Sequence, residues 1–431
     1  MILHNIWIAW KSLKRSPVLS VLIVLCIGIG IAFATTFAAV RHAFTKHPLP
    51  TQEGRLHYVR LDNWDPRMAY PGGEPDALPP QITLRDANEL RRSSIPVRQT
   101  ATYRARLFIF PEADVSRPFK ENIRVVDADF FPMFEVPFAH GSGWDRAADA
   151  KPEQVVVLSD AMNDRVFGGR NSVGQTLRLE DRDFRVVGVL SPWLPSMRMY
   201  DMTQNPLVEP EGLYIPFGLT TPMSLGTAGN SDGWGGGPDE QTFIQYWVEL
   251  DADSDVRAYR SFLESYITEQ KRQGRFQRPP NYRLSTIGQL MTDMRVAPKE
   301  TQPLLIVGLL FLLVASVNLI GLLLGKFLAR AAEVGVRRAL GASRRDVFLQ
   351  HLVECQVVAL LGGTVGLVLT GVALRGLNTF LRDATGRTDL IQLDVPILVL
   401  AVGLSILAGL VSGLYPAWRI CRVTPAIHLK A

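Results

Sequence analysis

Residue types that often carry out chemistry occur in this 431-residue chain, but without the combination of spacing and local structure that the chemistry requires. The seven histidines are scattered and form no HExxH pair, which argues against a metal centre or histidine-based catalysis. The string GLLLGKF (321–327) is one residue too short for a phosphate-binding loop and has phenylalanine where that loop needs Ser or Thr. The string GNSDG (229–233) has the GxSxG spacing, but it lies in the glycine-rich stretch 229–240, which is typical of a surface loop and not of the strand-to-helix turn that a nucleophile elbow needs. We therefore predict no catalytic residues, no metal site and no cofactor on this chain.

The segment ARAAEVGVRRALGASRRDVF (329–348) has spacing typical of protein recognition. Glu333 and Arg337 are four residues apart, so on a helix they form an ion pair on one face. The apolar side of this helix is expected to carry Val336, Ala339 and Leu340. We predict a short basic helix here.

The same segment contains signals that end one helix and begin the next. Gly341 fits the position after a helix C-terminus, and Ser343 with Asp346 fits a capping box at the next N-terminus. A rigid helix so held is suited to docking a cytoplasmic partner, whereas a loop that only sets topology needs no more than scattered Lys and Arg. The expected docking residues are Glu333, Val334, Val336, Arg337, Arg338, Leu340, Gly341 and Ser343.

The elements that position this segment are four stretches without any Asp, Glu, Lys or Arg. Each has about the 20 residues that a helix needs to cross a hydrocarbon core of ~30 Å. The first is too long for the apolar part of a cleaved signal peptide, so we expect it to remain as a span. The stretches are Ser16–Val40, Thr301–Gly325, Cys355–Leu374 and Val395–Trp418.

Basic residues flank these spans unevenly and predict the orientation of the chain. Residues 1–15, 326–353 and 419–431 together carry twelve basic and two acidic residues, whereas loop 375–394 is balanced. Because Lys and Arg in short loops resist translocation, we expect both termini and the 326–353 loop in the cytoplasm. The net charge of +5 therefore reflects topology and not nucleic-acid binding.

The predicted fold class is an α-helical membrane protein with four transmembrane helices and a large α+β extracytoplasmic domain. Two β-α-β units, one beside each flanking span, are expected to form a split, porter-like part into which a strand-rich part is inserted. The expected segments are an interfacial amphipathic helix 1–16, transmembrane helix 17–41, exported domain 42–301 (split part about 50–110 and 241–290, inserted part about 111–240), transmembrane helix 302–325, cytoplasmic loop and helix 326–351, transmembrane helix 352–375, outer loop 376–393, transmembrane helix 394–418 and cytoplasmic tail 419–431.

Small residues four apart within the spans predict close helix packing. Such pairs let helix backbones approach in lipid, within one protomer or between two. Asn318 is the most polar residue of its span and is expected to donate or accept a hydrogen bond between helices. The glycine pairs are Gly321 with Gly325, Gly362 with Gly366, and Gly409 with Gly413.

Four segments of the chain resemble one family. EVGVRRALGASRRDV (333–347) resembles the cytoplasmic loop of MacB- and FtsX-like permeases, and GLYPAWRICRVTPAIHLK (413–430) resembles their last span and tail. DADFFPMFEVPFAHG (127–141) and the run from VVVLSDAMNDRVFGG to FRVVGVL (155–190) resemble the exported MacB-type domain. The segments occur in the family's order over nearly the whole chain, so the chain resembles a MacB/FtsX/LolC-type (type VII) ABC transporter permease.

The resemblance implies a dimer, with a second copy or a paralogue, that works with a cytoplasmic ABC ATPase. Residues 333–343 would form the ATPase-docking helix, and ATP and Mg would be held by the ATPase. MacB carries its ATPase before the first span on the same chain, and only 15 residues precede the first span here, so we expect the ATPase on a separate chain.

The expected location is the inner membrane, in contact with lipid and not with nucleic acid, with the large domain in the periplasm. The expected function is efflux of a small molecule or peptide from the periplasm, with a periplasmic adaptor and an outer-membrane channel as further expected partners. Lipoprotein extraction and activation of a periplasmic partner remain alternatives within the family. An ATP-independent, membrane-anchored sensor or scaffold is the alternative from another class.

Overall fold

The computed structural model describes residues 7, 9, 11, 14, 17–46, 48–66, 70, 77–111, 117–226, 240–296, 301–329, 331–339 and 341–421. The chain forms two compact units, one of Met1–Lys46 with Ala297–Ala431 and the other of His47–Val296. Of the predicted interfacial helix 1–16, only Trp7, Ala9, Lys11 and Lys14 are described, and these four are helical. Most of the predicted tail, residues 422–431, lies outside the described residues.

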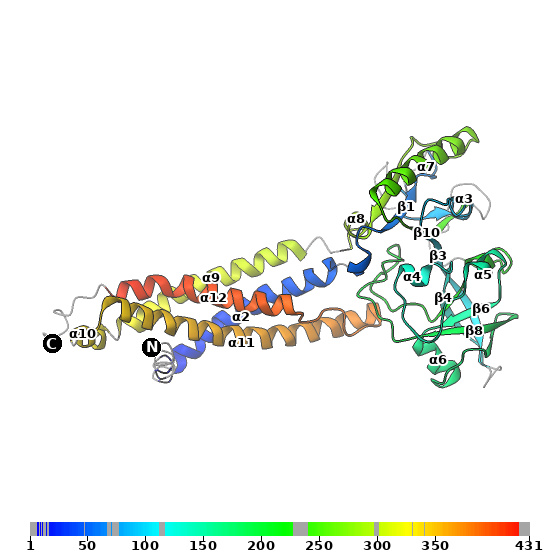
Figure 1. Ribbon diagram of the computed structural model, residues 1–431. Coiled ribbons are helices and arrows are strands. Elements are labelled where there is room, and N and C mark those ends of the chain that lie inside the picture. Colours follow the sequence, from blue (N-terminus) through cyan, green and yellow to red (C-terminus); the bar gives the residue numbers. More distant parts are fainter. Residues whose placement is uncertain are drawn as a thin grey trace. The chain divides into compact units, whose positions relative to one another are not determined.

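Among its described residues, the first unit contains four helices that are long and apolar enough to cross a membrane. They are α2 (Pro17–Thr45), α9 (Thr301–Leu328), α11 (Arg344–Thr385) and α12 (Val395–Ile420), with the short helix α10 (Ala331–Ala339) between α9 and α11 (Figure 1). These observations confirm the prediction of four apolar helices.

Helix α11 runs past both ends of its predicted span, 352–375. It begins at Arg344 because Ser343 caps its first turn, and it continues for 42 residues until Gly386, whose φ of +75° ends it. Within the sequence of α11 there is no proline to interrupt the helix, and its glycines do not break it.

The second unit, which lies between α2 and α9 in the chain, is built on one mixed sheet. Its strand order is β11-β1-β10-β3-β4-β9-β6-β8-β5, with β2 paired to β10 and β7 paired to β3 and β8. The pairs β4–β9 and β6–β8 are parallel and the others are antiparallel. The strands are β1 (Leu56–Leu61), β2 (Ile82–Thr83), β3 (Arg98–Phe110), β4 (Phe119–Val126), β5 (Phe138–Gly141), β6 (Val155–Leu158), β7 (Thr176–Leu179), β8 (Arg182–Leu190), β9 (Leu213–Pro216), β10 (Thr242–Glu249) and β11 (Tyr282–Thr286).

Two helices of this unit begin at side-chain caps whose pattern is present in the sequence. Thr83 caps α3 with Asp86 as its partner, and Ser159 caps α6, which ends at Gly168 with a φ of +65°. The helices are α3 (Leu84–Leu90), α4 (Phe130–Met133), α5 (Arg146–Ala150), α6 (Asp160–Phe167), α7 (Asp253–Arg272) and α8 (Ile287–Asp293).

The two ends of the unit meet in the order β11-β1-β10-β3, which is the arrangement of a split β-α-β fold with α3 and α7 as its crossovers. Figure 1 shows β1, α3, α7 and β10 in the same half of the unit. The predicted fold class, a split part with an inserted strand-rich part, is confirmed. The two parts share one sheet, however, because the 13-residue strand β3 pairs with β10 along its first residues and with β4 along the rest.

Both faces of the central strands are covered. Successive residues of a strand point to opposite faces, and in β10 Tyr246 and Val248 belong to one apolar cluster whereas Trp247 belongs to another. All eight residues of β10 are buried. The sheet is therefore the middle layer of this unit.

Candidate functional site

The docking segment folds as two capped helices joined by a tight turn. The Ser343 hydroxyl accepts a hydrogen bond from the Asp346 amide at 3.1 Å, and the Asp346 carboxylate accepts one from the Ser343 amide at 3.3 Å. Gly341 has a φ of +104°, a conformation that residues with a side chain rarely adopt. The predicted helix end and capping box are confirmed, and together they set the direction of α10 relative to α11.

The exposed face of α10 differs from the one that the sequence predicts. Ala331 and Val334 are buried in the bundle, so they form the apolar side. Val336, which we expected on that side, is 47% exposed. Arg337 donates to the Glu333 carboxylate at 2.7 Å, as predicted, and this pair is also exposed. The outward face therefore combines an apolar side chain with an ion pair, a composition suited to contact with another protein.

Contacts at the end of α10 hold it against its neighbours. The Arg338 guanidinium donates to the carbonyl of Cys421 at 3.2 Å, and Arg337 donates to the Gln350 side chain on α11 at 3.4 Å. Of the other predicted docking residues, Leu340 lies outside the residues that the structure describes. The docking role of this set stays a prediction.

Two of the three predicted glycine pairs lie at close contacts between helices of this chain. A Cβ at Gly366 would lie 2.9 Å from the Gly28 carbonyl oxygen on α2, and one at Gly362 would lie 2.8 Å from Ile27. On the other side of α11, a Cβ at Gly409 or Gly413 would come within 2.8 Å of an α11 side chain. These glycines let α2 and α12 approach α11.

The third glycine pair faces away from the bundle. Gly321 and Gly325 are exposed, and a Cβ at either would meet nothing within 4 Å. Asn318, one turn earlier on α9, is exposed as well. The three residues lie on one face of α9, and the interhelical hydrogen bond expected of Asn318 stays a prediction.

Sequence reasoning missed a buried ion pair beside the docking helix. Lys326 Nζ on α9 lies 2.9 Å from Glu354 Oε1 on α11, and the side chains are 3% and 4% exposed. Lys326 was assigned only a topological role. The sequence contains one signal for this pair, because each charged residue directly adjoins one of the uncharged stretches of the sequence.

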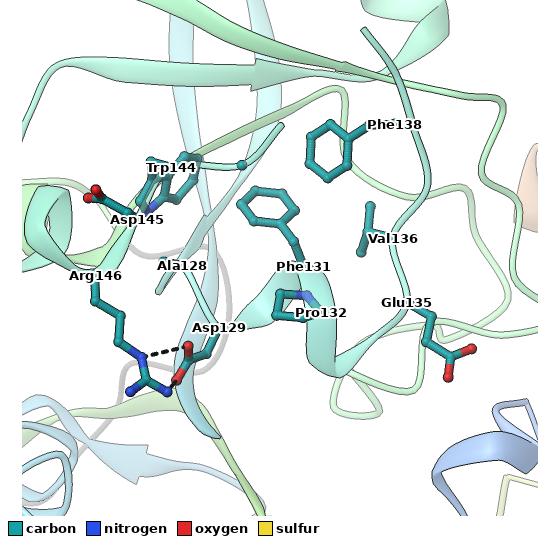
Figure 2. Close-up of a pocket in the computed structure, with 11 residues that line it drawn as sticks. Ala128, Asp129, Phe131, Pro132, Glu135, Val136, Phe138, Trp144, Asp145 and Arg146 are labelled. Atoms are coloured by element: carbon teal, nitrogen blue, oxygen red, sulfur yellow. Dashed lines mark hydrogen bonds and ion pairs between the residues drawn. The ribbon is translucent and has the colours of Figure 1, made fainter. Parts of the chain in front are cut away.

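The second unit contains a hollow of about 450 Å³ that the sequence did not predict. Figure 2 shows its aromatic wall, where the Phe131 ring meets Phe138 and Trp144 edge to face at centroid distances of 5.4 and 5.0 Å. Arg146 bonds to both carboxylate oxygens of Asp129 at its rim, at 2.9 and 2.7 Å. Phe131 and Trp144 are themselves buried, so little of the wall is free for contact with a ligand.

The half-buried carboxyl group of Asp149 supports this hollow, and the buried Asp127 directly precedes the lining residue Ala128. Asp149 accepts hydrogen bonds from the Trp144 indole at 2.9 Å and from the Ala128 amide at 2.7 Å. Burial raises the pKa of Asp149 to about 6 and that of Asp127 to about 7, and in Asp127 the nearby Arg91 opposes the shift.

A second buried network, of charged residues, joins the two parts of the sheet. Arg124 on β4 is fully buried and pairs with Asp201 at 2.5 Å and with Glu211 at 2.9 Å. Arg198 pairs with Glu211 at 2.7 Å, and Arg124 also donates to Gln245 on β10 at 3.3 Å. The network therefore holds the segment between β8 and β9, which carries Arg198, Asp201 and Glu211, against β4 and β10.

Within the described ranges, no cluster of three or more His, Cys, Asp or Glu side chains is arranged to hold a metal ion. The free cysteines Cys26, Cys355 and Cys421 all belong to the unit of long helices. The candidate functional surface of the described chain is the exposed face of α10, which carries Val336 and the Glu333–Arg337 ion pair.

Comparison with known proteins gives matches over most of the chain. The profile of the MacB-like periplasmic core domain matches residues 20–266, and that of the FtsX-like permease C-terminal region matches residues 305–425. The macrolide export ATP-binding/permease protein MacB of Syntrophobacter fumaroxidans is 25% identical over 337 residues, which are 70% of this chain and 46% of that protein. The chain thus spans about half the length of the MacB relatives that it matches.

Another relative matches from end to end. The uncharacterized ABC transporter permease YvrN of Bacillus subtilis is 21% identical over 447 residues, 99% of this chain and 99% of that protein. Among solved structures, the periplasmic region of MacB from Actinobacillus actinomycetemcomitans aligns with 57% of this chain and 95% of its own, at 16% identity and a TM-score of 0.37.

Proposed function

Because this chain belongs to the family of MacB-like ABC transporter permeases, we propose that it transmits an ATP-driven conformational change from a cytoplasmic ATPase to its extracytoplasmic domain. In this proposal the chain performs no chemistry of its own. It receives displacement at α10 and passes it along the long helices.

The observation that carries the proposal is the geometry of α10. Its exposed face presents Val336 beside the Glu333–Arg337 ion pair, and its buried face packs on the helices before and after it. A partner that contacts this face can move α9 and α11, since α10 follows one helix closely and a capped turn joins it to the other.

We further propose that the ATPase is a separate chain, which binds ATP and Mg. The end-to-end match to a protein named as a permease supports this arrangement. We place both termini and α10 in the cytoplasm and the second unit in the periplasm, on the positive-inside distribution of Lys and Arg.

A second permease copy or a paralogue is the proposed partner within the membrane. The face of α9 that carries Asn318, Gly321 and Gly325 supports this, because small residues allow close helix contact and an exposed amide in lipid gains a hydrogen bond there.

For the cargo we propose efflux of a small molecule or peptide from the periplasm, with an adaptor and an outer-membrane channel as further partners. Relatives named for macrolide export and for pyoverdine export support this choice. Lipoprotein extraction or activation of a periplasmic partner would use the same transmission.

The test is recovery of the ATPase with the tagged full-length chain, solubilised from host membranes in mild detergent. Mass spectrometry should identify an ABC ATPase with the native chain and lose it with Val336→Asp or Arg337→Glu. Arg382→Glu, the same charge change at the other end of α11, is the matched control and should retain it. An ATP-independent scaffold would bring down no ATPase at all, and this result would reject the proposal.

A further inference from the structure

The charges of Lys326 and Glu354 meet where two uncharged helical stretches end. Lys326 directly follows the uncharged stretch 301–325 of α9, and Glu354 directly precedes the uncharged stretch 355–374 of α11. Their charged atoms are 2.9 Å apart, and both side chains are almost completely buried.

A lysine at the end of a span ordinarily extends its flexible stem to place the ammonium group in water. Lys326 instead turns inward to a carboxylate on another helix. Removing one partner of a buried pair is strongly destabilising, but replacing both by apolar side chains of similar volume is often neutral. Packing alone therefore does not explain why charges occupy these positions.

The neighbouring residues make a second contact between the same helices. Phe327, next to Lys326, packs edge to face on the ring of His351 at a centroid distance of 4.5 Å. The His351 ring lies 2.8 Å from the Val347 carbonyl on its own helix, which fixes its orientation. Two consecutive residues of α9 thus engage two residues of α11 that lie three apart.

These two contacts together set the axial position of α9 relative to α11. Sliding one helix past the other by a turn, about 5.4 Å, would separate the two charges inside a region of low dielectric constant. The docking helix shares this region, because Ala331 and Val334 of α10 belong to the same apolar cluster as Phe327.

We propose that Lys326 and Glu354 are positioning residues whose ion pair holds α9 and α11 in one axial register, so that a displacement of α10 moves both helices together. The mechanical part of this proposal rests on the proposed function, in which α10 receives the displacement. The structural part, the control of register and of α10 placement, does not.

Hydrogen–deuterium exchange of the full-length chain in lipid nanodiscs tests the structural part, through peptides that cover residues 331–339. Lys326→Met or Glu354→Met should speed exchange there by about tenfold or more, the range expected when contacting partners are uncoupled. The charge-exchanged variant, Lys326→Glu with Glu354→Lys, should restore exchange to within about threefold of the native rate. Peptides from α7 in the same samples are the internal control and should not change.

The double variant Lys326→Met with Glu354→Met decides between an ion pair and simple packing. We expect it to fold and yet to exchange quickly in α10. Native protection in this variant, or fast exchange in a folded charge-exchanged variant, would overturn the proposal.

If the double variants do not fold, Lys326→Arg must keep the protection of α10 and Lys326→Gln must lose it, and equal rates in these two would also overturn the proposal. The exchange experiment contains no ATPase. Failure to recover an ATPase in the docking experiment would therefore reject the proposed function and leave the register proposal standing.

Discussion

Replacement of Arg124 by methionine removes one charge from the centre of the buried network in the second unit. Methionine is close in length but cannot pair with Asp201 or Glu211, to which Arg124 is bound at 2.5 and 2.9 Å. Glu211 keeps Arg198 as a partner at 2.7 Å, so the carboxylate most affected is Asp201, which retains hydrogen bonds from Thr203 and Gln245.

The expected loss of stability follows from this geometry. Breaking a buried pair by removing one partner costs about 3–5 kcal/mol. A domain of this size loses about 2–4 °C in Tm per kcal/mol, so Arg124→Met should lower the transition of the second unit by about 6–20 °C. Burial alone would raise the pKa of Asp201, but Arg124 and Arg198 hold it below its ordinary value. Without Arg124 its pKa should rise, so the loss should be smaller at pH 5 than at pH 8.

Intrinsic tryptophan fluorescence of the detergent-solubilised chain measures this transition, since Trp193 stacks on Tyr200 at a centroid distance of 5.8 Å, beside the network. Arg146→Met is the matched control. Arg146 pairs with Asp129 at 2.7 Å but is 66% exposed, and such surface pairs contribute only about 0–1 kcal/mol. Equal shifts in Tm for the two variants would refute the reasoning that burial sets the value of the Arg124 pairs.

Further outcomes follow from other features. Burial raises the pKa of Asp127 to about 7 and that of Asp149 to about 6, above the unfolded value of about 4, so the folded domain takes up protons and its free energy of unfolding should fall as the pH rises from about 4 to 7. Thermal unfolding across this range checks the sign, and Asp127→Asn should flatten the dependence. Gly366→Leu should destabilise the helix bundle by about 1–3 kcal/mol because its side chain meets the α2 backbone, whereas Gly376→Leu on the same helix has open space; thermal unfolding in detergent compares them. Gly321→Leu should leave the protomer folded and weaken its self-association, which crosslinking in membranes measures; unchanged crosslinking would remove α9 from the proposed dimer contact.

The features that the sequence predicted well depend on neighbouring residues. The caps at Thr83, Ser159 and Ser343 need a partner within three residues, so their pattern is complete in a short stretch of sequence. The four apolar helices likewise follow from local composition. Strand β4 was missed because its first half, FKEN, is polar and only its pairing with β3 makes it a strand.

The rest of the site depends on contacts between distant residues. On α10, Val334 and Val336 are both apolar, and only the packing of the bundle determines that Val334 is buried and Val336 is exposed. The Lys326–Glu354 pair joins two helices across an intervening helix, so each charge alone has the sequence signature of an ordinary span boundary. The network around Arg124 has the same character, with partners 77 and 87 residues away.

If the chain transmits a displacement as proposed, the unbroken length of α11 determines how large the movement at its far end can be. Its 42 residues form a rod about 63 Å long at ~1.5 Å per residue. If the end beside α10 is held and the rod tilts by about 5°, the opposite end swings sideways by about 5 Å, close to the pitch of one helical turn. In the proposed transmission, α11 would convert a small rotation beside α10 into a step at its far end that is large enough to exchange one set of side-chain contacts for the next.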